Sequence, residues 1–521
     1  MLSRKAFQKL EEAVGRENVS CEPAVLDTYA WQPTINDNPS KWVFRPAAVV
    51  LPASVEEVQE TVRICNKHGL KFKAFSTGWG VYSGPTSENV VQIDMRRMNR
   101  IIEIDEKNMF AVIEPYVSGA QLQAEAMKLG LNTHIIGAGP ACSPLASATS
   151  GWGMGWDSVY MSSSARNILG VEWVLPDGEL LNMGAPGSVN EWFSGDGPGP
   201  SLRGIMRGAS GTLGGLGVFT KCAVKLYNWP GPSQLVSEGL LLDSRIKNMP
   251  GNFKFYICFF PDKNSIAKAA YDLGDEELGY LFFKTASAAY LNSAIPALLK
   301  KIARTRNIRG ILDRTLKWSF MVMLAGNSEG ETSYMEEVFN TIIDKSGGFS
   351  IEMLKVPAVG SMLLMNFLRV SAVPMVFRTG GAFSNSLVRG ETWDTQLNWA
   401  EDVAGIKKRW AEKDAICDNL GDNPFTAVYE NNMWAQCENI IQYDNSREDH
   451  VGGLQDLLKE LTDKAVNTTM EPLASKDSSQ RKQISPLLFE FNRWQQKISA
   501  VFDTGRAADT GMYCCEDGDK D

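Results

Sequence analysis

The stretch Ala74-Phe75-Ser76-Thr77-Gly78-Trp79-Gly80-Val81-Tyr82-Ser83-Gly84-Pro85 lies between two apolar runs, residues 70–75 and 90–93. The pattern predicts a strand, a tight glycine turn and a short exit. Three glycines permit positive φ and let bare backbone N–H groups approach an anion, which can hold a pyrophosphate without a lysine. The P-loop lysine and the G-x-G-x-x-G spacing are both missing, so neither a P-loop nor a Rossmann dinucleotide site is predicted. Taken alone, an ordinary turn is the alternative.

Length and composition limit the class of protein. A chain of 521 residues exceeds one hydrophobic core, so two or three domains are expected. The formal net charge of −9 disfavours nucleic acid as a partner, because phosphate binding needs a basic face. Residues 1–7 interleave charged and apolar side chains without an apolar core, so no signal peptide is predicted and a cytoplasmic location is expected.

Cysteine and histidine usage gives no sign of a metal site. The nine cysteines are scattered without a C-x-x-C pair, and the three histidines, His68, His134 and His450, lie far apart in the sequence. A multi-histidine site would need most of them together. We therefore expect reduced thiols and no metal.

The residues around the glycine turn predict a β-α-β unit. Residues 45–52 predict a short strand, Ser54-Val55-Glu56-Glu57 is a capping box that opens a helix to about Asn66, and residues 71–75 predict the next strand. This order places the turn at the carboxyl end of a strand, where open α/β sheets bind ligands.

Further elements are predicted on both sides of this unit. Residues 1–40 predict a helix followed by a loop, and residues 118–129 a second helix. Strands are expected at residues 90–94, 101–104, 110–114, 170–175, 179–182 and 218–226, with a second glycine turn at 208–214. Residues 137–164 show no period and predict a long irregular segment, a kind that is usually functional.

Five segments follow one another in a recognisable order: residues 45–58, the glycine turn, and residues 93–99, 174–179 and 211–220. Together they resemble the FAD-binding domain of the vanillyl-alcohol oxidase / p-cresol methylhydroxylase (PCMH) family, including its glycolate-oxidase-like branch. The resemblance covers about residues 40–230. It implies an α+β fold in which a PCMH-type FAD-binding domain of two α+β subdomains precedes a C-terminal α/β substrate-binding cap.

The resemblance also implies domain boundaries. Residues 1–40 would be an N-terminal arm, 41–230 the FAD-binding domain, 231–500 the cap, and 501–521 a C-terminal return segment and tail. Residues 502–513 resemble the family's usual ending, although Thr504 and Arg506 replace its proline and asparagine.

By resemblance, FAD would lie along three parts of the chain. The residues implied are Ser76, Thr77, Gly78, Trp79, Gly80, Val81, Tyr82 and Ser83 at the pyrophosphate, Pro144, Leu145, Ala146, Ser150, Gly151 and Gly153 along the cofactor, and Gly211, Gly217 and Val218 near the adenine. Many relatives tether FAD through a histidine in the first loop, and this loop has none, so we expect non-covalent FAD. A tether through Cys142 is the alternative, and a buried structural thiol is favoured there.

The cap offers acid/base and anchoring candidates: Tyr429, Glu430, Arg378, Glu438 and Tyr443. A structural role is the alternative for each of them. In the glycolate-oxidase-like branch a cap segment carries paired histidines that hold a metal, whereas residues 427–444 contain no histidine. No metal ligand is therefore predicted.

Residues 290–317 stand out from the acidic background. They contain one acid, Asp313, among seven basic residues: Lys300, Lys301, Arg304, Arg306, Arg309, Arg314 and Lys317. The interleaved apolar residues favour helices with one basic face. The segment at 300–317 is interpreted as a solvated face, or as a docking surface for an acidic redox protein or a membrane. No apolar run reaches transmembrane length.

These features predict an FAD-dependent oxidoreductase. We expect a dehydrogenase that transfers a hydride from an alcohol or hydroxy acid C–H to flavin N5 and passes electrons to a protein acceptor. The alternatives are a phenol-type alcohol oxidase that uses oxygen and an FAD-carrying subunit of an electron-transfer complex. The protein is expected to be a homo-oligomer or a subunit of a redox complex.

Overall fold

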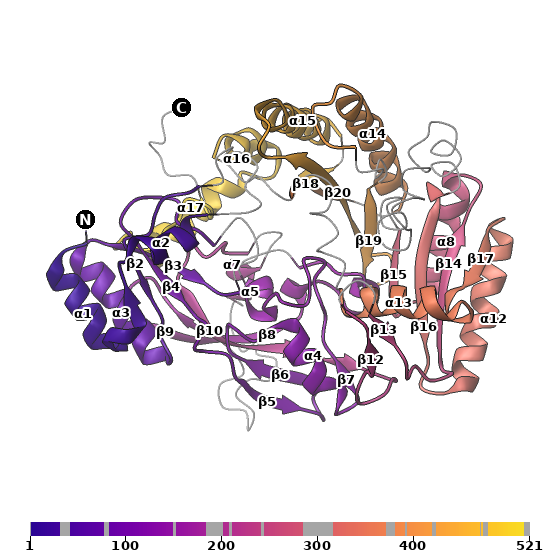
Figure 1. Ribbon diagram of the computed structural model, residues 1–521, viewed down its shortest axis with the longest axis horizontal. Helices are drawn as coiled ribbons and strands as arrows, with labels where there is room; N and C mark the ends of the chain where they lie inside the picture. The colour runs from indigo at the N-terminus through magenta and orange to yellow at the C-terminus, as the bar shows by residue number, and fades with distance from the viewer. Residues whose placement is uncertain are drawn as a thin grey trace.

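The computed structural model describes residues 2–31, 42–77, 83–149, 153–183, 202–207, 211–240, 244–284, 316–370, 381–390, 393–418, 424–468, 470–472 and 478–514. Within these ranges the strands form a four-stranded, a five-stranded and an eight-stranded sheet, together with two short ribbons (Figure 1). Helices pack on all three sheets, which agrees with the predicted α+β fold class.

The first sheet carries the strand that enters the glycine turn. Its strands, in spatial order, are β1 (Val19–Ser20), β2 (Ala48–Val50), β4 (Val90–Asp94) and β3 (Lys71–Phe75). The last three are parallel. Helix α3 (Val55–His68) begins at Ser54, whose hydroxyl accepts a hydrogen bond from the Glu57 N–H, as the capping box predicts. The apolar faces of α3 and of α1 (Arg4–Val14) close one side of this sheet.

The second sheet is antiparallel and holds the other half of the N-terminal region. Its strands, in spatial order, are β5 (Ile101–Asp105), β6 (Phe110–Ile113), β10 (Val218–Lys225), β8 (Ile168–Val174) and β9 (Leu180–Met183). The predicted hairpin is present as β8 and β9, and Gly178 in its turn has a φ of 87°. Helix α4 (Gly119–Met127) packs on this sheet through Leu122 and Ala126.

Residues 137–164 were expected to be irregular, and that expectation is wrong in part. They contain α5 (Pro144–Thr149) and α6 (Ser158–Met161). Helices of six and four residues span less than two turns, so they leave no periodic pattern in the sequence. Burial of Leu145 and Ala148 against the second sheet stabilises α5 instead.

The eight-stranded sheet forms the core of the C-terminal half and is antiparallel. In spatial order its strands are β17 (Phe349–Glu352), β14 (Phe253–Phe259), β16 (Ser319–Ala325), β15 (Leu281–Lys284), β19 (Phe425–Tyr429), β20 (Trp434–Asp444), β18 (Gly381–Gly390) and β21 (Glu471–Pro472). Its longest pairing joins β18 and β20.

The outer face of this sheet is covered by four helices: α8 (Lys263–Asp275), α12 (Glu329–Lys345), α14 (Trp393–Glu412) and α15 (Glu448–Val466). Figure 1 shows α14 and α15 on the side of β18 and β20 that faces away from α5 and β8. Strand residues Val388, Cys437 and Ile441 point to these helices. Because side chains alternate along a strand, Gln436, Glu438, Ile440 and Gln442 lie on the inner face.

The inner face is covered unequally. Helix α13 (Pro357–Leu368) packs over the half made by β14, β16 and β15, where Phe367 lies 4.8 Å from Phe283 and 5.9 Å from Phe255 between ring centroids. On the β18–β20 half, Asn385, Glu438 and Ile440 are partly exposed. Among the described residues, the sheet thus keeps a partly exposed, partly polar patch on its inner face, which we call the open patch.

The last described residues return to the first sheet after α16 (Ser478–Ile484) and α17 (Phe491–Phe502). The Phe72 N–H donates to Ala507 O (2.8 Å) and the Asp509 N–H donates to Phe72 O (3.0 Å), so this segment lies parallel to β3. The Asp503 carboxylate accepts from the N–H groups of Ala507 and Ala508.

The domain boundaries expected at residues 40, 230 and 500 stay predictions.

The remaining described α-helices and strands are short: α2 (Pro23–Ala30), α7 (Arg203–Met206), β7 (Leu131–Asn132), β11 (Tyr227–Asn228), β12 (Ser237–Glu238) and β13 (Arg245–Ile246). In the part of the chain that the structure describes, no helix has both the length and the apolar character needed to cross a membrane.

Candidate functional site

Both ends of the first glycine turn are held by side-chain hydrogen bonds. The Ser76 hydroxyl donates to Pro115 O (2.5 Å), and the Thr77 hydroxyl accepts from the Ser143 N–H (3.2 Å). At the exit, Gln92 Nε2 donates to Ser83 O (3.0 Å). The turn is therefore tied to the second sheet at its start and to β4 at its end. The predicted residues Gly78, Trp79, Gly80, Val81 and Tyr82 lie outside the described residues.

Helix α5 follows Ser143 directly, so the contact with Thr77 places this helix beside the turn. Leu145 is buried in the core, whereas Pro144 and Ala146 are partly exposed. Of the predicted cofactor residues here, Pro144 and Ala146 are thus the ones with accessible side chains. Ser150 and Gly151 lie outside the described residues.

The second glycine turn packs against the end of α5. Thr149 O accepts from the Thr212 N–H (2.9 Å) and hydroxyl (3.1 Å). Gly211 has a φ of +56°, and a Cβ there would lie 2.5 Å from Thr149 O. Gly217 has a φ of +97°, and a Cβ would lie 2.4 Å from Val174 O. Conformation and packing both require glycine at these positions. Val218 points into the core.

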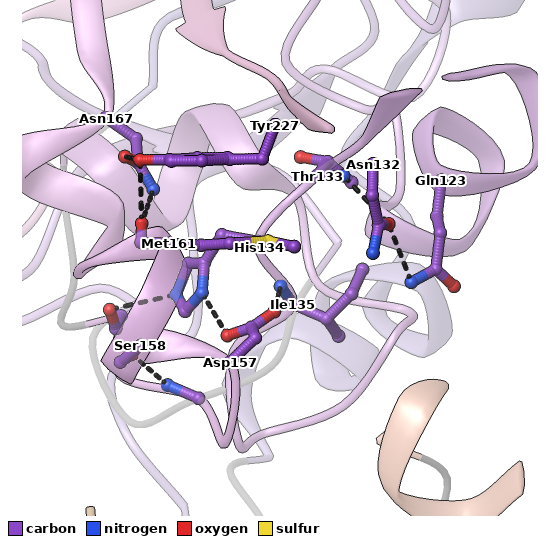
Figure 2. A network of polar contacts seen from close by, with 12 residues as sticks. Gln123, Asn132, Thr133, His134, Ile135, Asp157, Ser158, Met161, Asn167 and Tyr227 are labelled. Atoms are coloured by element: carbon purple, nitrogen blue, oxygen red, sulfur yellow. Dashed lines mark hydrogen bonds and ion pairs between the residues drawn. The ribbon is translucent and has the colours of Figure 1, made fainter. Parts of the chain in front are cut away.

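A buried polar network fixes the segment that begins at Gly153 (Figure 2). His134 Nε2 donates to Gly153 O (3.1 Å), since a carbonyl can only accept, and His134 Nδ1 lies 2.5 Å from Asp157 Oδ1. Asp157 Oδ2 accepts from the Ile135 N–H (2.9 Å). A Cβ at Gly153 would lie 1.9 Å from Ser164 Oγ, so packing explains this glycine. The sequence interpretation missed this pair, although His134 is one of only three histidines.

Glu438 is the predicted catalytic residue that lies in the open patch of the inner face. Its Oε1 accepts from Asn385 Nδ2 (2.7 Å), and the neighbouring Ile440 pairs with Asn385 across the two strands. Tyr429 lies on the same face, is 8% exposed, and its hydroxyl donates to Gln436 Oε1 (2.6 Å). The sheet therefore brings Glu438 and Tyr429 to one side, and adds Asn385, which sequence reasoning did not single out.

Glu430 lies at the β19–β20 turn and joins the two halves of the molecule. Its carboxylate accepts from the Ser162 hydroxyl (2.7 Å) and from Arg166 Nε and Nη2 (2.8 and 2.9 Å). Burial raises the pKa of Glu430, but the hydrogen bonds from Ser162 and Arg166 outweigh burial, so that its pKa is lowered. These contacts favour an anchoring role for Glu430 between the cap and the segment after α6.

The other two catalytic candidates lie elsewhere. Tyr443 points to α14 and α15, is 1% exposed, and burial raises its pKa to about 12. It lies five positions after Glu438 on β20, and an odd spacing along a strand places two side chains on opposite faces. This placement favours a structural role for Tyr443. Arg378 lies outside the described residues.

The basic segment is described only at its end. Residues 300–315, with Lys300, Lys301, Arg304, Arg306, Arg309 and Arg314, lie outside the described residues. Lys317 Nζ lies 2.7 Å from Glu401 Oε1, and Lys263 contacts the other oxygen of this carboxylate. The docking function of the basic segment at 300–317 stays a prediction.

The described residues contain no cluster of the kind that binds a metal. Across those ranges, no group of three or more His, Cys, Asp or Glu side chains is arranged to hold an ion. Whether the whole chain binds a metal stays a matter of prediction.

Comparison with known proteins shows which family the N-terminal part of the chain resembles. Residues 46–184 match the FAD binding domain family. The 4-cresol dehydrogenase [hydroxylating] flavoprotein subunit of Pseudomonas putida is 30% identical over 236 residues, or 43% of each chain. The 1'-carboxy-chondrochloren decarboxylase of Chondromyces crocatus is 33% identical over 242 residues, covering 43% of this chain and 41% of the relative. The matched region thus covers less than half of these relatives.

Solved structures extend the likeness to the whole chain. The structure of p-cresol methylhydroxylase with substrate bound matches with a TM-score of 0.76 and 18% identity, covering 99% of this chain and 98% of that one. The 4-ethylphenol oxidase from Gulosibacter chungangensis gives 0.73 and 19%, covering 98% and 97%. The comparisons confirm the predicted family resemblance, the PCMH-type fold and FAD as cofactor.

The described residues fit FAD. Thr77, at the start of the first glycine turn, contacts Ser143 just before α5, and the second turn packs against the end of α5, where a Cβ at Gly211 would lie 2.5 Å from Thr149 O. Such turns expose backbone N–H groups to an anionic ligand. Among the described residues, two buried polar atoms on β3 and β4, Lys73 Nζ and Gln92 Oε1, have no hydrogen-bond partner.

Proposed function

We propose that this chain, which carries an FAD-binding domain and has the fold of p-cresol methylhydroxylase, is an FAD-dependent dehydrogenase acting on an alcohol or hydroxy acid carbon. The observation that carries the proposal is the open inner patch of the eight-stranded sheet, where the Glu438 carboxylate is held by Asn385. The FAD-linked oxidoreductases and dehydrogenases among its relatives support the reaction class. When bound, FAD supplies a two-electron acceptor for a hydride.

Glu438 is our candidate for the group that takes the proton of the substrate hydroxyl. Asn385 occupies Oε1 and orients the carboxylate, since a side chain held by a fixed donor loses less freedom when substrate binds. Helix α13 covers the neighbouring half of the inner face and so excludes water from that side of the patch. Tyr429 is the alternative, although its hydroxyl already donates to Gln436.

A protein is the electron acceptor that we propose. The relative from Pseudomonas putida is by name a flavoprotein subunit, which supports a place in a redox complex. The likeness to 4-ethylphenol oxidase supports the second candidate, an oxidase that hands electrons to oxygen. The two functions differ in the acceptor and share the reductive half-reaction.

The function is tested by anaerobic mixing of the purified flavoprotein with a panel of 2-hydroxy acids and of phenolic alcohols. We expect at least one member to bleach the flavin absorbance, and the reduced protein to react faster with an artificial dye than with oxygen. Rapid oxygen consumption with the same substrate would favour the oxidase. If no small donor bleaches the flavin and only a second protein reduces it, the dehydrogenase proposal is wrong.

We also propose that FAD is bound without a covalent link. Cys142 is 7% exposed, and burial raises the pKa of its thiol to about 12, so the reactive thiolate is disfavoured. Acid precipitation of the pure protein should leave the yellow colour in the supernatant. Flavin that stays with the precipitate, followed by mapping of the labelled peptide to Cys142 or to a cap residue, would contradict this prediction.

A further inference from the structure

Helix α17 has apolar side chains on two of its faces. On one face, Ile498 and Phe502 pack against the core of the second sheet, where Phe502 stacks on Trp173 with the ring centroids 5.6 Å apart. On the other face, Trp494 is 56% exposed and Val501 is 74% exposed. Trp494 and Val501 lie about two helical turns apart, so they share one side of the helix. The described residues thus cover the first face and leave the second open.

The turn before α17 adds two exposed apolar side chains, Leu487 (58% exposed) and Phe489 (92% exposed). This turn is ordered, because the Glu490 N–H donates to Ser485 O (2.8 Å). Phe489 and Glu490 both have a φ of 55°, a conformation that is costly for residues other than glycine. Such strain is expected where a surface has a task. The fold therefore holds Phe489 outward at a cost in free energy.

The charged residues around these side chains are mostly basic. Between residues 481 and 502 the exposed cations are Lys482, Arg493 and Lys497, and Glu490 is the single acid. Lys497 Nζ lies 4.5 Å from the centroid of the Trp494 ring, which is a cation–π contact. A chain with a net charge of −9 thus carries a local positive charge beside its exposed apolar side chains.

We call this region the α17 surface, and its members are Leu487, Phe489, Arg493, Trp494, Lys497 and Val501. Its apolar side chains project from a turn and from a helix face, so they suit a soft apolar medium that can surround them. Tryptophan together with lysine or arginine is typical of the boundary between lipid headgroups and acyl chains. The positive charge of Arg493 and Lys497 complements anionic headgroups.

The overall negative charge of the chain does not prevent this contact. At physiological ionic strength the Debye length is about 8 Å, so charges farther away than this are largely screened. The charges that decide attraction to a lipid surface are those on the side chains that touch it, and on the α17 surface these are Arg493 and Lys497.

We propose that the α17 surface binds peripherally to a membrane that contains anionic lipids. Phe489 and Trp494 enter the boundary between headgroups and acyl chains, and Arg493 and Lys497 meet the lipid phosphates. A contact of this kind needs no helix that spans the membrane. The inference goes beyond the proposed function and does not depend on the substrate or the electron acceptor.

The test is flotation of the FAD-loaded full chain with two kinds of vesicle, one of phosphatidylcholine alone and one of phosphatidylcholine mixed equally with phosphatidylglycerol. We expect the protein to float with the mixed vesicles and to stay behind with phosphatidylcholine alone. Salt at 1 M, where the Debye length is about 3 Å, should weaken the binding. A parent protein that does not float with the mixed vesicles contradicts the proposal.

Apolar and basic side chains are then removed separately. Phe489→Ala and Trp494→Ala should each weaken binding to the mixed vesicles about tenfold, because an aromatic side chain no longer leaves water. Arg493→Gln with Lys497→Gln should weaken it about 25-fold, or about fivefold for each charge. The charge-preserving pair Arg493→Lys with Lys497→Arg should bind like the parent.

Tyr334→Ala is the control for non-specific adsorption. Tyr334 is 68% exposed on α12, which lies at the opposite end of the molecule from α17 (Figure 1). This variant should bind the mixed vesicles like the parent. If it loses as much binding as Phe489→Ala, the vesicles adsorb exposed aromatic side chains wherever they lie, and the proposal is wrong.

Light scattering distinguishes a membrane from a second copy of the chain. Phe489→Ala and Trp494→Ala should keep the parent's mass in solution, its flavin content and its thermal unfolding, since both side chains are exposed. If these variants have a lower mass than the parent while their vesicle binding is unchanged, the α17 surface is a contact between copies of this chain, and the inference is overturned.

Discussion

Replacing Glu438 by glutamine is expected to slow reduction of the bound flavin by its substrate about 10²- to 10⁴-fold, the usual contribution of a general base. Glutamine keeps the size of the side chain and an oxygen for Asn385, so the patch should keep its shape. Only the ability to take a proton is lost. Stopped-flow mixing under anaerobic conditions measures the reduction rate directly, and flavin occupancy shows whether the fold is intact.

Tyr443→Phe is the matched control, because Tyr443 was predicted from the same strand but points to the outer helices. Its reduction rate should stay within about threefold of the parent, the range of changes away from the reacting atoms. Tyr429→Phe tests the alternative base. If Tyr429→Phe abolishes reduction while Glu438→Gln leaves it intact, the proton is taken by the tyrosine, and Glu438 loses its proposed role.

Replacing Gly211 by alanine is expected to give protein that has lost most of its flavin. An L-residue at positive φ costs about 1–2 kcal/mol, and the new Cβ would in addition lie 2.5 Å from Thr149 O. The end of α5 must therefore move. Since α5 is tied to the first turn through Ser143 and Thr77, the displacement reaches the cofactor cradle.

Gly214→Ala separates the cost of an L-residue at positive φ from the cost of the steric contact with Thr149. Gly214 lies in the same turn with a φ of +68°, but the nearest atom to a new Cβ is 3.7 Å away. This variant should lose about 1–2 kcal/mol of stability from the conformation alone, and should keep its flavin. Visible absorbance per protein and thermal unfolding compare the pair. Equal flavin loss in the two variants would show that the contact with Thr149 does not position the cradle.

Local pattern was enough for several elements of the cofactor half of the protein. The capping box at Ser54, the strand that ends at Phe75, the hairpin around Gly178 and the second glycine turn are all set by residues close together in sequence. Turns and helix caps depend on only a few neighbouring residues, so they can be predicted without knowledge of the fold. The order of these segments carried the family resemblance that the comparisons confirm.

Tertiary structure decided what the sequence could not. Pairing of β18 with β20 placed Asn385 beside Glu438, 53 positions away in the chain, and strand alternation sent Tyr443 to the other face. Lys73 and Asp509 are separated by most of the sequence, and only the return of the C-terminal segment along β3 brings them together. Which face a strand residue occupies, and which distant strand it pairs with, depend on the register of the sheet, and a single sequence does not determine that register. Glycine turns and helix caps can be predicted because the residue types themselves favour those backbone conformations.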